Sequence, residues 1–162
     1  PYDTYQDDSL AKTIHPIASP NTLHTSIVQL TNGLPASVGA VIWSGFSNPN
    51  TTPYIPFYFG INHPQQYYSK EAPDEQKASF AYRKLAGRYH REPSLYSQTF
   101  PEVWTKFQEK CLKEQVKIDQ GAMRLFRMDH RMARHFITVN VESLATQALD
   151  IAEKQLEKVS SD

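Results

Sequence analysis

Five polar side chains that could contact a substrate gather near residue 20 of the sequence. They are His15, Asn21, Thr22, His24 and Thr25. All precede or enter a segment with an alternating pattern, so several of them can face a cleft at the end of a strand. The competing interpretation is local turn bonding, because short polar side chains before a strand often bond to nearby backbone groups. The residues alone leave both interpretations open.

Cys111 is the only cysteine, which excludes an internal disulfide and a thiolate zinc cluster. It could act as a nucleophile if a histidine or a helix N-terminus lowered the pKa of its thiol. However, it lies between Phe107 and Ile118 on an apolar stripe, in the middle of a predicted helix. We therefore predict that Cys111 is a packed core thiol. Trp104 and Phe107, three residues apart, are likewise predicted to be core residues.

The segment RLFRMDHRMARH, residues 124–135, contains four arginines and two histidines. It could present a basic helix face to phosphate groups or acidic partners. Asp129 and the balanced charge of the chain favour instead an ordinary solvated helix face. His130 and His135 are five residues apart and no HExxH motif occurs, so we predict no metal site.

Motifs for other catalytic centres are missing from the sequence. There is no G-x-S-x-G nucleophile elbow, no glycine-rich phosphate loop and no evident pair of acid and base carboxylates. We therefore predict that this chain does not hold a complete catalytic centre, and we predict no cofactor.

Three strands are expected in the first part of the chain, over residues 22–30, 36–43 and 54–60. The first strand has polar and apolar side chains on each of its two faces. The second is continuously apolar, which indicates burial on both faces. Gly39 within the second strand suggests a bulge or a close approach of another backbone. Pro56 donates no ladder hydrogen bond, so the third strand belongs at an edge or beside a bulge.

The period changes to that of helices after residue 62. A helical stripe covers residues 75–91 and ends before Pro93. A second helix should begin at a capping box formed by Thr99 and Glu102, with a third over residues 122–136 and a fourth starting at Asn140. Strands followed by helices indicate the α+β class, in one unit with a strand region (1–62) and a helical region (63–162).

Length and charge limit the partners that we expect. The chain has 162 residues, 17 basic and 17 acidic side chains, and no apolar run of about 20 residues. We expect neither nucleic acid nor a membrane as a partner. Three strands with one edge interrupted by proline cannot form a closed sheet. We also expect the helices to cover only one face of this sheet. A further β-layer must then come from outside this chain.

The start of the chain, PYDTYQDD, has neither an initiator Met nor a secretory signal, so we interpret the chain as a fragment. A mature protein trimmed after secretion is the alternative. A fragment with an uncovered apolar strand should form homo-oligomers or swap strands.

The order of motifs in the first part of the chain resembles the C-terminal part of dipeptidases of peptidase family C69, relatives of the secernins among the N-terminal-nucleophile (Ntn) hydrolases. The matching features are the polar strand before Leu-Pro, the Val-x-Trp strand, the loop to Pro-Phe-Tyr, and the helix ASFAYRKLAG. The resemblance extends over about residues 1–92.

This resemblance implies part of an αββα sandwich whose nucleophile is an N-terminal cysteine outside this chain. It implies a dipeptide substrate, the N-terminal portion of the same protein as a partner, and no catalytic residue here. Asn21, Thr22 and His24 become candidate substrate-binding residues. His15 stands where we expect the family often to carry arginine, which would alter the binding of a substrate carboxylate.

Two other functions stay open. A non-enzymatic relative of the secernin type would keep the sandwich for binding a partner. A helical interaction module would use residues 94–160, independently of the strands.

Overall fold

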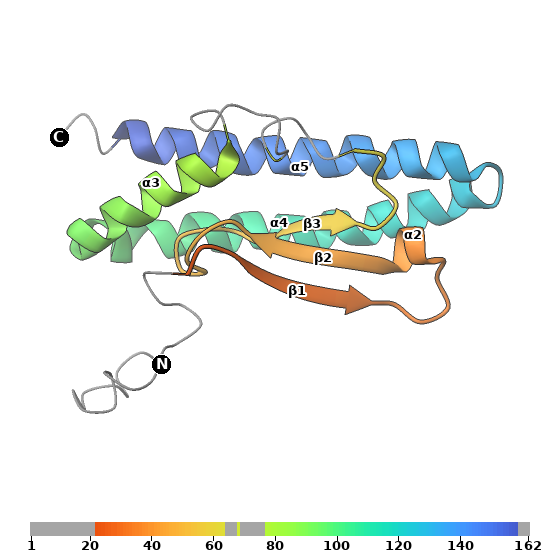
Figure 1. Cartoon of the computed structure of the whole chain (residues 1–162), viewed down its shortest axis with the longest axis horizontal. Coiled ribbons are helices and arrows are strands. Elements are labelled where there is room, and N and C mark those ends of the chain that lie inside the picture. Colours follow the sequence, from red (N-terminus) through yellow and green to blue (C-terminus); the bar gives the residue numbers. More distant parts are fainter. Residues whose placement is uncertain (1–21, 64–67, 69–76, 159–162) are drawn as a thin grey trace.

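The computed structural model describes residues 22–63, 68 and 77–158, with the backbone alone for residues 93–101. Three antiparallel strands form one sheet in the order β1 (Thr25–Leu30), β2 (Ala40–Gly45), β3 (Ile55–Tyr58). The four-residue helix α2 (Ala36–Gly39) precedes β2. Three long helices follow the sheet: α3 (Ala78–Arg91), α4 (Pro93–Phe126) and α5 (His130–Lys158). The α+β class and the three strands are therefore as predicted (Figure 1).

One face of the sheet packs on α4 through polar contacts. The Trp43 Nε1–H and the Gln115 Nε2–H both donate to the Gln29 side-chain oxygen, at 2.9 and 3.0 Å. Tyr58 of β3 makes a second contact with α4, because its hydroxyl donates to the Asp119 carboxylate at 2.6 Å. Because buried polar groups lose water, these partners are needed to keep the strand–helix interface stable.

The opposite face of β3 is also covered. The Phe57 ring, which points away from α4, lies 5.7 Å from the Tyr68 ring. Tyr68 in turn contacts Tyr82 of α3 and donates a hydrogen bond to the Ala145 carbonyl of α5. Our expectation that the helices cover only one face is therefore wrong for β3. It fails because the chain folds back after β3 and brings α3 and α5 to the other side.

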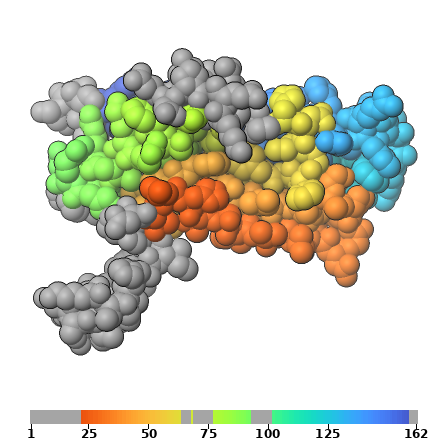
Figure 2. Space-filling model, in the orientation of Figure 1, coloured from red at the N-terminus to blue at the C-terminus, as the bar shows by residue number. Residues whose placement is uncertain are grey.

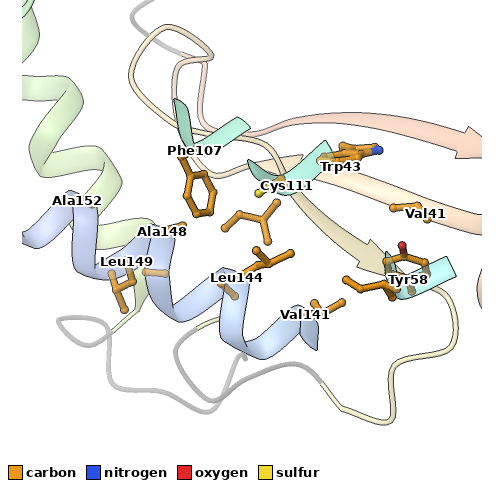
Figure 3. Packing of buried hydrophobic residues seen from close by; sticks show 14 of the residues in the cluster. Val41, Trp43, Tyr58, Phe107, Cys111, Val141, Leu144, Ala148, Leu149 and Ala152 are labelled. Atoms are coloured by element: carbon orange, nitrogen blue, oxygen red, sulfur yellow. The ribbon is translucent and has the colours of Figure 1, made fainter. Parts of the chain in front are cut away.

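A hydrophobic core is shared by β2, β3 and the three long helices. Figure 3 shows Phe107 and Cys111 of α4 facing Leu144 and Ala148 of α5. Small buried residues at Ala145, Ala148 and Ala152 let the two helices approach closely. Trp104, Phe107 and Cys111 are all buried, as predicted.

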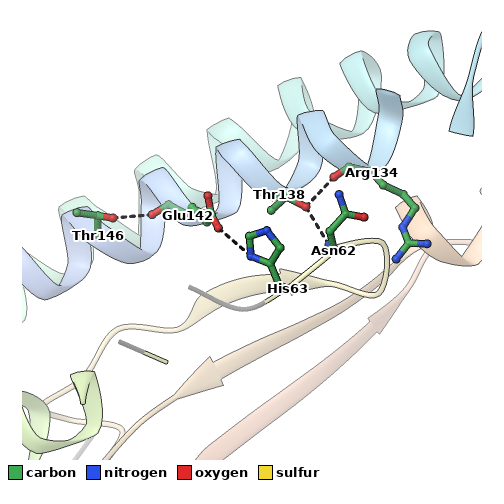
Figure 4. Close-up of polar contacts among 6 residues, drawn as sticks. All are labelled: Asn62, His63, Arg134, Thr138, Glu142 and Thr146. Atoms are coloured by element: carbon green, nitrogen blue, oxygen red, sulfur yellow. Dashed lines mark hydrogen bonds and ion pairs between the residues drawn. The ribbon is translucent and has the colours of Figure 1, made fainter. Parts of the chain in front are cut away.

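Hydrogen bonds attach the segment after β3 to α5 (Figure 4). The Asn62 amide donates to the Thr138 hydroxyl at 3.0 Å, and the His63 Nδ1 lies 3.5 Å from the Glu142 carboxylate. The Arg134 Nε–H donates to the Gly60 carbonyl at 3.2 Å. These contacts fix the path of the chain as it leaves the sheet.

The predicted start of the second strand needs correction. The segment predicted as one strand over residues 36–43 begins with α2, because Pro35 starts a helical turn in which the Val38 and Gly39 amides donate to its carbonyl. Gly39 does mark a close backbone approach, since an added Cβ would lie 2.9 Å from the Thr31 carbonyl oxygen. Pro56 lies on β3, at the edge of the described sheet, as predicted.

Three helix boundaries differ from prediction. Helix α4 begins at Pro93 and not at Thr99, because proline at a first helical position needs no amide partner. The predicted third helix is divided by a turn at residues 127–129. Asn140 is not a cap: it lies inside α5, where its side chain donates to the Phe136 carbonyl. No helix in the described part of the chain combines the length and hydropathy needed to cross a bilayer.

Candidate functional site

The candidate substrate-binding residues lie at the end of the sheet where β1 begins and β2 ends. Thr25 is opposite Gly45 in the strand pairing, so residues just before Thr25 lie beside those just after Gly45. Thr22 is partly exposed and His24 is exposed. The His24 ring meets the Phe46 ring edge-on, with centroids 5.5 Å apart. Thr22 and His24 are therefore near the loop that follows β2.

This loop, residues 46–54, is buried although its side chains are polar. Ser47, Asn48, Thr51 and Thr52 are each at most 3% exposed. The Asn48 side-chain oxygen accepts from the Asn50 amide at 2.9 Å, and the Asn48 carbonyl accepts from both the amide and the hydroxyl of Thr51. These local bonds satisfy polar groups that would otherwise be costly to bury.

Helix α4 holds the end of the same loop. The Gln108 side-chain oxygen accepts a hydrogen bond from the Tyr54 amide at 3.0 Å. At the start of the loop, an added Cβ on Gly45 would lie 3.2 Å from the Thr52 methyl group, so the two loop ends are closely packed. The loop at residues 46–54 is thus held in place at both ends and supports the end of the sheet.

Phe46 continues from the loop into a chain of aromatic rings. It lies 6.0 Å from Phe57, 5.1 Å from Tyr68 and 6.4 Å from Tyr82, measured between centroids. The Tyr68 hydroxyl has one hydrogen, and it donates this hydrogen to the Ala145 carbonyl. The Tyr82 hydroxyl must therefore be the donor in the 3.1 Å hydrogen bond between the two tyrosines. Burial raises the pKa of both tyrosines, so neither is a base near neutral pH.

The Thr25 hydroxyl is buried at this end of the sheet. It has no hydrogen-bond partner among the residues that the structure describes. A buried hydroxyl without a partner costs free energy, so a group outside the described residues would stabilise the site by bonding to it.

Sequence and structure agree on part of this site. The structure brings Thr22 and His24 to one sheet end, whereas Asn21 and His15 lie outside the described residues. It adds Phe46 and Asn48, which the sequence did not single out as site residues. The signal was the concentration of Asn and Thr in SNPNTT, whose capacity for local hydrogen bonds allows a loop to be buried.

The described residues of this site include no cysteine. Cys111 is completely buried in the helical core, and burial raises the pKa of its thiol to about 12. No group of three or more metal-ligating side chains occurs among the described residues. What the sheet end offers is therefore a rigid wall with an exposed imidazole and a partly exposed threonine, suited to contacting a ligand.

Comparison with known proteins relates the chain to a family of peptidases. The profile of peptidase family C69 matches residues 1–86, which include all three strands and the first part of α3. A protein of Streptococcus pyogenes serotype M1 named "Probable dipeptidase B" is 31% identical over 58 residues. That match covers 36% of this chain and 12% of the length of the relative.

Proposed function

Because the chain belongs to peptidase family C69, we propose that it forms the C-terminal portion of a cysteine-type Ntn dipeptidase. The observation that carries this proposal is the family match across the whole sheet and its buried loop, together with a relative named as a dipeptidase. In this proposal the nucleophilic cysteine begins the mature protein and lies outside this chain. Its own α-amine acts as the base when the thiol attacks the dipeptide amide.

The burial of Cys111 supports a nucleophile that lies outside this chain. A nucleophilic cysteine needs an exposed thiol with a lowered pKa, and Cys111 is buried with a raised pKa. We infer that this chain on its own is inactive and that it contributes one wall of the active site.

We assign Thr22 and His24 to that wall as substrate contacts. Both lie at the sheet end where β1 begins, with His24 against the Phe46 ring, and the adjoining backbone is held by the buried loop and by Gln108. A hydroxyl and an imidazole can each hydrogen-bond to the polar backbone of a short peptide. Contacts of this kind act mainly on substrate binding, so their loss should raise KM more than it lowers kcat.

The test is a panel of dipeptides presented to the complete protein with a processed N-terminal cysteine. We expect hydrolysis, with KM raised several-fold by His24→Ala and unchanged by Leu23→Ala, the matched control at the neighbouring exposed position. A correctly folded complete protein that leaves every dipeptide intact would refute the enzymatic proposal. An equal effect of both variants would remove His24 from the site without touching the family assignment.

The non-enzymatic alternative of the secernin type makes a different prediction. The first residue of the mature complete protein would then be neither Cys, Ser nor Thr, because only these can act as the N-terminal nucleophile. An independent helical module is not favoured by the packing, since β2 and β3 share one core with α4 and α5. Folding of the helices after deletion of residues 1–60 would reverse that judgement.

A further inference from the structure

The turn between α4 and α5 carries a dense group of arginines at one end of the molecule. We call Arg124, Arg127, Arg131 and Arg134 the arginine tip. In Figures 1 and 2 the turn forms the end of the molecule that is coloured cyan to light blue. All four arginines are exposed. The tip lies on the helical hairpin, away from the sheet end where Thr22 and His24 lie (Figure 1).

The tip concentrates positive charge in a chain whose formal net charge is zero. Residues 124–135 contain the four arginines and a single acidic residue, Asp129. The Asp129 carboxylate already accepts a hydrogen bond from the Arg131 amide at 2.7 Å, which caps the start of α5. Acidic residues that balance these charges lie elsewhere in the chain. The balance seen in the composition therefore hides a local excess of positive charge.

Asp129 is the single acidic residue at the start of α5, and it lies before the first turn of the helix. Negative side chains are favourable near a helix N-terminus, where the backbone dipole is positive. The first turn of α5 has no acidic residue, and it carries His130 and Arg131 instead. Such departures from local preference are typical of functional surfaces. The positive charge of Arg131 at this position therefore needs an explanation other than helix stability.

The arginines of the tip remain available to a partner. Arg124, Arg127 and Arg131 form no ion pair with a carboxylate among the described residues. Arg134 donates a hydrogen bond from its Nε–H to the Gly60 carbonyl, which leaves its two terminal amino groups available to a partner. Exposed apolar surface accompanies them, since Met128 is 76% and Met132 is 49% exposed. The tip thus combines unpaired charge with apolar contact area.

The choice of side chains indicates the chemistry of the partner. The chain has seven arginines and ten lysines, yet residues 124–135 hold four of the arginines and no lysine. Lysine serves as well as arginine for general attraction to a charged surface, whereas arginine makes two parallel hydrogen bonds to a carboxylate or to a phosphate group. Arginine and methionine are also both enriched in protein–protein interfaces.

We propose that the arginine tip is a docking surface for an acidic protein segment. Its glutamate or aspartate carboxylates pair with the arginines of the tip, and its apolar side chains contact Met128 and Met132. This proposal does not rest on the peptidase function.

The test uses the full chain and a fluorescein-labelled helical peptide with glutamates at i, i+4 spacing and leucines between them. Fluorescence anisotropy should show binding that weakens with added salt. Arg127→Glu and Arg131→Glu should each weaken it at least ten-fold. Lys113→Glu, the same charge change at an exposed position of α4, should leave it unchanged. Arg131→Glu should not lower the Tm, since a carboxylate suits the start of α5.

Two further measurements distinguish an acidic protein segment from other anionic partners. Arg127→Lys keeps the charge and loses the paired geometry, so it should still weaken peptide binding several-fold. Vesicles containing phosphatidylserine and a single-stranded RNA should bind less tightly than the peptide. Tighter binding of the vesicles or the RNA, equal binding by the lysine variant, or no binding of the peptide would each overturn the proposal.

Discussion

Cys111 shows how the surroundings of one residue decide its chemistry. Its thiol is completely enclosed between α4 and α5, and the desolvation that follows from burial raises its pKa to about 12. A thiol in this state forms almost no thiolate at neutral pH, and thiolate is the reactive form. The residue acts as a small apolar side chain in the helical core.

We predict that Cys111 does not react with a thiol reagent in the native protein and reacts fully once the protein is unfolded. Cys111→Ala should lower the free energy of unfolding by about 1 kcal/mol, because it removes one buried heavy atom. The peptidase activity of the complete protein should not change. Rapid labelling of the native protein with a disulfide reagent at pH 8 would contradict the burial of this thiol.

The buried tyrosines predict how stability depends on pH. Burial raises the pKa of Tyr58, Tyr68 and Tyr82 above the ordinary value, and the hydrogen bond to Asp119 raises that of Tyr58 further. The native state therefore keeps these protons while the unfolded chain releases them near pH 10. The stabilisation is complete below about pH 10 and is lost as the pH rises above it.

The experiment compares urea unfolding of the wild type and Tyr58→Phe at pH 8, 10 and 11. The wild type should lose stability steeply above pH 10. The variant should lose it less steeply, by up to about 1.4 kcal/mol per pH unit, because one fewer proton is linked to unfolding. Identical slopes for the two proteins would mean that Tyr58 does not hold its proton more tightly in the native state.

At the scale of elements, α2 and the end of β3 are joined by a close backbone contact. An added Cβ on Gly60 would lie 2.3 Å from the Ser37 carbonyl oxygen. That oxygen belongs to the backbone of α2, so it cannot turn aside as a flexible side chain would. By contrast, Gly87 lies within α3, and an added Cβ there would meet nothing within 4 Å.

The two glycines give a matched pair of substitutions. We predict that Gly60→Ala lowers the free energy of unfolding by about 3 kcal/mol, since α2 and β3 must move apart. Gly87→Ala should raise it by roughly 0.5–1 kcal/mol, because alanine favours a helix and restricts the unfolded chain. Chemical unfolding of both variants measures these changes, and a neutral Gly60→Ala would show that α2 can shift freely.

At the scale of the whole molecule, β1 is the least covered part of the fold. It pairs with β2 on one side, and no further strand pairs with its other side among the described residues. Its exposed apolar side chains lie on both faces, with Ile27 53% and Val28 63% exposed. Exposed apolar strands at a sheet edge are prone to pair with other chains.

We predict that the 162-residue chain by itself self-associates through β1. Light scattering should give a mass that rises with concentration, and Val28→Lys should suppress the rise by placing a charge on the strand. Val139→Lys, at an exposed position of α5, is the control and should not change it. A monomer of constant mass over a wide concentration range would exclude this surface as an association site.

The sequence by itself determined the class of the fold, the three strands, the edge position of Pro56 and the burial of Cys111. Each of these follows from a local pattern: alternation, a missing amide donor, or an apolar stripe with helical spacing. The family resemblance was likewise visible in the order of local motifs. The helix boundaries were less accessible, because Thr99 and Asn140 have the chemistry of caps but lie inside longer helices.

Only the tertiary structure decided which distant segments meet. It brought His24 to Phe46 and covered β3 on both faces. These features depend on the direction in which the chain turns after each element. Packing across the whole molecule sets that direction, and composition and periodicity report only what lies within one element.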